Sequence, residues 1–129
     1  YRIYLDGKLE MLIKLPENQD IERTSYYWSP DGRYVAFWWI PDIDEFPVVM
    51  AVLDMETHEF VDYGIQNLYS YKYAPEIFWS PDSQYVLFQV WEEIDSEFSK
   101  LVIVDIHEGR AAQIEENVVP YGWMTDSEP

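Results

Sequence analysis

The chain has 129 residues, of which 48% are hydrophobic and 18% aromatic, and its formal net charge is −17. This length corresponds to one domain, and the apolar content excludes a disordered chain. The charge disfavours partners such as nucleic acid and anionic membrane surfaces, and the absence of cysteine excludes disulfides and thiolate metal sites.

The elements predicted first along the chain are short β-strands joined by turns. One strand lies within residues 1–6, and the next runs from about residue 24 to Trp28. The Ser-Pro-Asp-Gly sequence that follows is typical of a tight turn, because proline fixes the first corner and aspartate caps the turn. Strands at about 33–39, 48–53 and 59–63 complete this group. No segment has the apolar period of an amphipathic helix.

The second half of the chain repeats this pattern with an offset of 51 residues. Residues 26–54 align with residues 77–105 without a gap, and the same offset predicts strands near 74–79, 84–91, 101–104 and 110–114. The positions that are identical in the two copies are Trp28, Ser29, Pro30, Asp31, Tyr34, Val35, Phe37, Ile43, Asp44 and Asp54, with their counterparts.

These repeats predict an all-β fold made of β-propeller blades, each with four antiparallel strands. Residues 24–66 and 72–116 form two full blades, residues 1–18 the end of a preceding blade, and residues 118–129 the start of a further one. We therefore expect residues 1–129 to be a single segment of an incomplete propeller, since closed propellers have about four to eight blades. The chain is expected to be a piece of a longer propeller or to complete a ring with other copies.

The repeat resembles the WD40-like PD40 repeat of TolB-type propellers, in which a Trp-Ser-Pro-Asp-Gly turn precedes a strand such as RYVAF. The third copy departs from this pattern at Met124 and Thr125. The resemblance implies a periplasmic or extracellular protein, although this chain contains no signal peptide and no apolar run that would insert into a membrane. The residues that form the structural repeat motif are Trp28, Pro30, Asp31, Trp79, Pro81, Asp82, Trp123 and Asp126.

Serines in the repeated turns are the first candidates for catalysis. Neither Ser29 nor Ser80 lies in a Gly-X-Ser-X-Gly elbow, and neither has a histidine in sequence context that would act as its base. A turn serine whose hydroxyl bonds the backbone explains both equally well. We therefore expect no catalytic residue and no enzymatic activity in this chain. The strand tryptophans, such as Trp38 and Trp91, are expected to fill the space between blades.

Two acidic loops join the second and third strands of successive blades and are candidate partner-binding sites. Carboxylates on adjacent blades would attract a basic protein or hold Ca²⁺ through oxygen ligands. Neither loop has the spacing of a dedicated calcium loop, so we predict no metal site and no cofactor, with calcium as the alternative. The candidate residues are Asp42, Asp44, Glu45, Glu92, Glu93, Asp95 and Glu97.

A longer connection between the two full blades, residues 63–76, is rich in tyrosine. Tyr69, Tyr71 and Tyr73 are candidate partner contacts, because tyrosine supplies contact area at a low entropic cost. The resulting hypothesis is a non-catalytic TolB/PD40-like scaffold for protein–protein interaction. The first alternative is the gating propeller of a prolyl oligopeptidase-like serine peptidase whose catalytic domain lies outside this chain. The second is a carbohydrate- or calcium-binding propeller.

Overall fold

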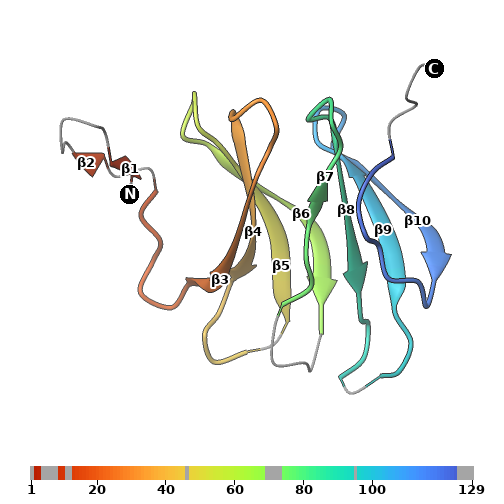
Figure 1. The fold of residues 1–129 in the computed structure, drawn as a ribbon. Coiled ribbons are helices and arrows are strands. Elements are labelled where there is room, and N and C mark those ends of the chain that lie inside the picture. The colour runs from red at the N-terminus through yellow and green to blue at the C-terminus, as the bar shows by residue number, and fades with distance from the viewer. Residues whose placement is uncertain are drawn as a thin grey trace, which may run out of the picture.

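The structure is a computed structural model that describes residues 2–3, 9–10, 13–45, 47–68, 74–94 and 96–124. All its regular elements are β-strands, as Figure 1 shows. The strands, in chain order, are β1 (Arg2–Ile3), β2 (Leu9–Glu10), β3 (Asp20–Trp28), β4 (Tyr34–Ile40), β5 (Val48–Asp54), β6 (Phe60–Asn67), β7 (Phe78–Trp79), β8 (Tyr85–Val90), β9 (Lys100–Asp105) and β10 (Arg110–Glu116).

Two four-stranded antiparallel sheets form the body of the molecule. The first sheet has the order β3-β4-β5-β6 and the second the order β7-β8-β9-β10, so each sheet is a simple up-and-down meander. The sheets stand side by side (Figure 1), and β1 pairs with β2 in a separate two-stranded sheet. This arrangement confirms the predicted all-β class and an incomplete, unclosed propeller. The described residues contain no helix that would cross a membrane.

The hydrogen-bond register repeats between the two four-stranded sheets, which we call blade 1 (β3–β6) and blade 2 (β7–β10). Trp28 pairs with Val35 in blade 1, and Trp79 pairs with Val86 in blade 2. Tyr34 likewise lies opposite Asp54, as Tyr85 lies opposite Asp105. Residues that are 51 positions apart in the sequence therefore occupy equivalent places in the two blades.

Strand bounds differ from the sequence prediction in several places, and β6 runs on to Asn67 rather than ending near residue 63. β3 begins at Asp20 rather than near residue 24, because Asp20 and Ile21 pair with the far end of β4 beyond a register shift. β7 begins at Phe78 rather than at residue 74, in a segment that contains Pro75, which has no N–H for a ladder. Residues 117–124 form no strand, and Asp126 lies outside the described residues.

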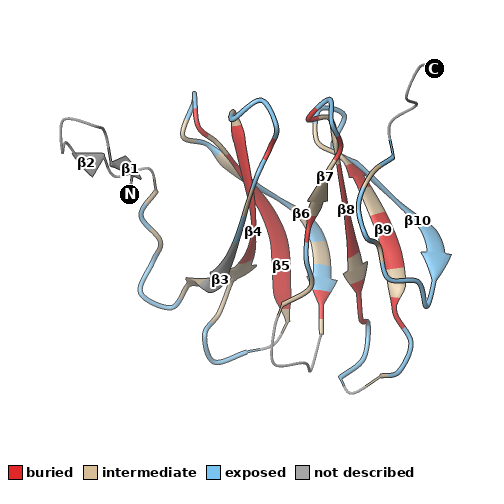
Figure 2. Cartoon of the chain, in the orientation of Figure 1, coloured by how far each residue is buried: buried red, intermediate tan, exposed pale blue. Residues whose placement is uncertain are grey.

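The apolar core lies mainly between the two blades (Figure 2). β4 is buried on both faces, since Tyr34, Ala36 and Trp38 face blade 2 while Val35 and Phe37 belong to a second cluster on the opposite face. This alternation explains why a strand with no polar residue is stable. The outer strand β10 is exposed along its whole length.

Candidate functional site

The repeated Ser-Pro-Asp sequence forms the predicted turn at the same end of each blade. Ser29 is buried, and its hydroxyl donates to Asp31 Oδ1 at 2.6 Å and accepts from the Tyr34 N–H at 2.9 Å. Blade 2 repeats both bonds, with Ser80 Oγ 2.5 Å from Asp82 Oδ1 and 2.9 Å from the Tyr85 nitrogen. Each serine hydroxyl thus donates a hydrogen bond to the carboxylate of its own turn, as expected for a serine that stabilises the turn.

One position in this turn adopts a left-handed conformation that favours glycine. Gly32 has φ of 74°, and Ser83 stands at the equivalent place with φ of 60°. A non-glycine residue is strained there. The Ser83 hydroxyl, however, accepts a hydrogen bond from the Asp31 N–H at 3.1 Å. Blade 2 therefore keeps a strained serine whose hydroxyl bonds the turn of blade 1.

The seam between the blades contains a tryptophan contact that the repeat motif positions. The Trp79 indole Nε1 donates to the Tyr27 carbonyl of blade 1 at 2.7 Å. Its ring stacks on Tyr34 with 6.1 Å between centroids and 16° between planes. Trp38 lies deeper, with its indole donating to the Pro75 carbonyl at 2.8 Å and its ring edge-on to Phe88. The prediction that strand tryptophans fill the space between blades is confirmed for Trp38 and Trp91, which both belong to the buried cluster there.

Asn67, the last residue of β6, joins the two blades at the end of their interface that lies away from the Ser-Pro-Asp turns. Asn67 is fully buried, its Nδ2 donates to the Gln89 carbonyl, and its Oδ1 accepts from the Trp91 N–H, both at 3.0 Å. The Leu68 N–H also donates to the Trp91 carbonyl at 2.8 Å. Sequence reasoning missed Asn67. The signal was Asn117, which directly follows β10 and aligns with Asn67 only after a one-residue gap.

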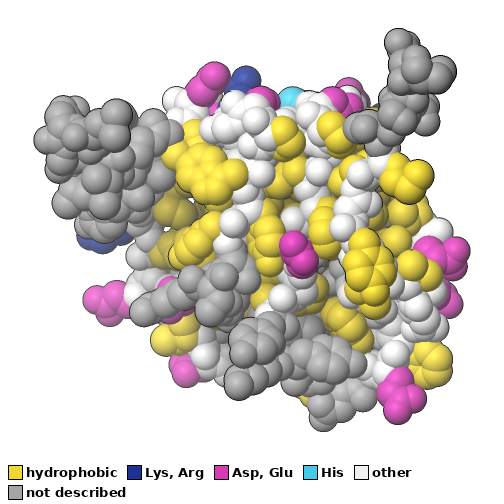
Figure 3. Space-filling view, viewed as in Figure 1, with side chains coloured by type: hydrophobic (Ala, Val, Ile, Leu, Met, Phe, Trp, Pro, Cys, Tyr) yellow, Lys and Arg dark blue, Asp and Glu magenta, His cyan; other side chains and the backbone are white. Residues whose placement is uncertain are grey.

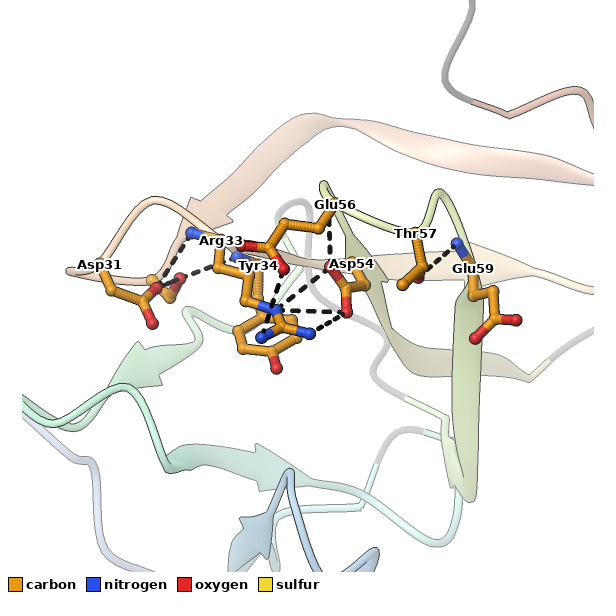
Figure 4. A network of polar contacts seen from close by, with 8 residues as sticks. Asp31, Arg33, Tyr34, Asp54, Glu56, Thr57 and Glu59 are labelled. Atoms are coloured by element: carbon orange, nitrogen blue, oxygen red, sulfur yellow. Dashed lines mark hydrogen bonds and ion pairs between the residues drawn. The ribbon is translucent and has the colours of Figure 1, made fainter.

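A charged network lies beside the turn of blade 1 (Figure 4). Arg33 NH2 donates to Asp54 Oδ2 at 2.9 Å, and the Arg33 NH1 lies 3.5 Å from Glu56. In blade 2 the equivalent Gln84 Nε2 donates to Asp105 Oδ2 at 3.2 Å. The Arg33 hydrogen bond holds the pKa of Asp54 below its usual range, and the Ser29 hydroxyl does the same for the pKa of Asp31.

Acid pH is expected to destabilise the fold through these carboxylates. Because their pKa values are lower in the folded chain than in the unfolded chain, the stabilisation is complete above about pH 4 and is lost as the pH falls through the folded-state values. The midpoint of urea unfolding, measured from pH 7 to pH 2, should fall less steeply in Asp54→Asn than in the native chain. Asp44→Asn removes the same charge from an exposed loop and serves as control. An equal slope in both variants would contradict this account.

The described parts of the two acidic loops, residues 41–45 with 47 and residues 91–94 with 96–99, lie at the end of the blades opposite the Ser-Pro-Asp turns (Figure 1). Asp and Glu side chains are visible toward both corners of this lower margin in the space-filling view (Figure 3), and others lie at the top and sides of the same face. Asp42 caps its own loop by accepting from the Asp44 N–H at 3.1 Å, and Glu92 pairs with Lys100 at 2.7 Å. The remaining described candidates are exposed: Asp44, Glu45, Glu93 and Glu97.

Some predicted site residues lie outside the part of the chain that the structure describes: Asp95, Tyr69, Tyr71 and Tyr73. The tyrosine contacts therefore remain predictions. Within the described residues, no three His, Asp or Glu side chains are grouped in a way that would hold a metal ion.

An exposed isoleucine stands at the same position in each acidic loop. Ile43 is 56% exposed and Ile94 is 61% exposed, and the two residues are one repeat apart. Carboxylates flank both side chains, with Asp44 beside the first and Glu93 beside the second. These isoleucines are identical in the sequence repeat but are not among the predicted site residues, because an aliphatic side chain in an acidic loop carries no charge that marks it as a contact.

The architecture is that of an incomplete β-propeller, and solved structures with similar folds include TolB and prolyl endopeptidase propellers. In solved structures it is similar to TolB from Acinetobacter baumannii, with 18% sequence identity and a TM-score of 0.54 over 86% of this chain. It is also similar to a prolyl endopeptidase, with 16% identity and a TM-score of 0.57 over 79% of this chain. The chain spans 25% of the length of the first protein and 16% of the second. No protein-family model and no curated protein sequence matches it.

Proposed function

We propose that the chain is a non-catalytic interaction segment of a TolB-like propeller, and that it binds a basic protein partner through its two acidic loops. The observation that carries this proposal is the exposed isoleucine at the same position of both loops, Ile43 and Ile94. The resemblance of the repeat to that of exported propellers supports a periplasmic or extracellular location.

Apolar contact and charge have separate roles in this proposal. The net charge of −17 and the exposed loop carboxylates raise the association rate of a basic partner. Ile43 and Ile94 supply apolar area that is removed from water only when a partner covers it. Charge alone would bind any polycation, whereas two aliphatic side chains at a fixed spacing favour a basic surface that also carries apolar residues.

Two lysine-rich peptides of equal charge test this proposal, one containing two leucines and the other none. We expect the leucine-containing peptide to bind more tightly by isothermal titration calorimetry. The double variant Ile43→Ser/Ile94→Ser should weaken its binding by about tenfold and should leave the all-lysine peptide unaffected, since burial of each isoleucine contributes about 1.5–3 kcal/mol at most.

A matched variant separates the loops from the rest of the surface. Val61→Ser removes an exposed aliphatic side chain from β6, near the turn end of blade 1, and should leave the binding of both peptides unchanged. Equal affinity for the two peptides, with no effect of the isoleucine variant, would show that the loops attract polycations by charge alone and would refute the proposal.

A further inference from the structure

The tryptophan contact of the blade seam occurs a second time, on the far face of blade 2. The Trp123 indole Nε1 donates to the Phe78 carbonyl at 3.2 Å, and its ring lies 6.3 Å from that of Tyr85, tilted by 30°. Phe78 and Tyr85 are the repeat equivalents of the carbonyl and ring that receive Trp79 on blade 1. Each blade thus presents the same receiving pair, one carbonyl and one tyrosine ring.

Trp123 makes this contact without the support of a blade. Residues 117–124 form no strand, and its neighbours Tyr121 and Met124 are 93% and 97% exposed. Its hydrogen bond is longer than that of Trp79 and its ring is less parallel. The receiving pair on blade 2 is therefore filled by a tryptophan from a segment without strand structure.

The third repeat tryptophan, Trp28, lies on the face of blade 1 that points away from blade 2, and it has no receiving pair among the described residues. It is 56% exposed, and no described residue accepts its indole hydrogen or stacks on its ring. It borders an apolar groove of 390 Å³ on the face of blade 1 that points away from blade 2. The other residues that line the groove are Ile13, Ile21, Tyr26, Val35, Phe37, Leu53 and Met55.

We propose that these two faces are complementary and that copies of this chain associate head to tail. Trp28 of one copy replaces Trp123 on the Phe78 carbonyl and Tyr85 ring of the next copy. The occupant of the groove is then the far face of blade 2 in a second copy. This face fits because it carries the same receiving pair, in the same register, that already joins blade 2 to blade 1.

This interface joins two different faces, so each copy is rotated relative to the one before it. A ring forms when these rotations bring the last copy into contact with the first. Two to four copies, each with two full blades, would supply the four to eight blades of a closed propeller. The net charge of −17 opposes the approach of a second copy, and salt screens that repulsion. Association is therefore expected to strengthen with ionic strength, unlike binding of the basic partner proposed above.

Sedimentation velocity and light scattering on the full chain test the proposal at low and high salt over a wide range of concentration. Trp123 belongs to the same chain as the receiving pair, so it competes at a high effective concentration with Trp28 of a second copy. Trp123→Ala removes this competition and should strengthen association by about tenfold or more. Trp28→Ala, added to Trp123→Ala, should return the chain to monomer. Trp28→Phe keeps an apolar ring without the indole donor and should give an intermediate affinity.

Tyr121→Ala is the matched control, since it removes an exposed aromatic ring from the same segment and should leave association unchanged. Far-UV circular dichroism verifies that each variant is folded. A Trp123→Ala chain that stays monomeric at every salt concentration would overturn the proposal and assign the groove to a blade of the same polypeptide. Association of Trp123→Ala that persists when Trp28 is also replaced would overturn it as well, because another face would then be responsible.

Discussion

Trp38→Ala is expected to lower the free energy of unfolding by about 3–5 kcal/mol, the range for truncation of a buried aromatic side chain. Trp38 is fully buried in the middle of β4, faces blade 2 and lies edge-on to Phe88 with 5.4 Å between ring centroids. Its loss opens a cavity between the blades and leaves the Pro75 carbonyl without its indole donor. Urea unfolding followed by far-UV circular dichroism measures the effect.

The neighbouring Trp39 supplies the control, because it points to the opposite face of the same strand. It is half-buried against Phe60, and its indole nitrogen is buried with no hydrogen-bond partner among the described residues. Trp39→Phe removes this unpaired donor and should change stability by less than about 1 kcal/mol, whereas Trp38→Phe should cost about 2 kcal/mol. Equal costs for the two phenylalanine variants would contradict a stabilising role for the inter-blade cluster.

Asn67→Ala is expected to cost about 3 kcal/mol, because two buried backbone groups lose their partners at once. The Gln89 carbonyl and the Trp91 N–H both depend on this side chain. The change should also accelerate hydrogen exchange at the Trp91 amide, which reports directly on this end of the seam. Urea unfolding and exchange monitored by NMR provide the two measurements.

Gln66→Ala is the matched control for this change, since Gln66 precedes Asn67 on β6 and is exposed. Its effect should lie within about 0.5 kcal/mol. A cost below about 1 kcal/mol for Asn67→Ala, together with an unchanged Trp91 amide, would show that the blades are held together without this side chain.

The sequence predicts the parts of the fold that the repeat encodes. The turn at Pro30 and Asp31 follows from local chemistry, since proline, aspartate and glycine each favour one position of a tight turn. The placement of Trp79 between blades follows from its recurrence. The equivalence of the two blades follows from the 51-residue offset, which places Tyr34 opposite Asp54 and Tyr85 opposite Asp105.

The remaining features depend on contacts between the blades, which the sequence does not display. Asn67 is one of several polar residues in β6, and only the packed seam shows that both the oxygen and the nitrogen of its amide are used. Ser83 is identified as strained only from its backbone angle, and its bond to Asp31 crosses from one blade to the next. Ile43 is one aliphatic residue in an acidic loop, and its exposure follows from the geometry of that loop.

The seam also determines the order in which the structure can assemble. The bonds from Trp79 to Tyr27 and from Asp31 to Ser83 each join residues 52 positions apart, whereas every strand within a blade pairs with a neighbour in the chain. Bringing residues 52 positions apart into contact lowers the entropy of the chain before the seam contacts can offset that loss. We therefore expect the hairpins of each blade to form first, because their contacts are local, and docking of one blade on the other to be the slower step that completes the core.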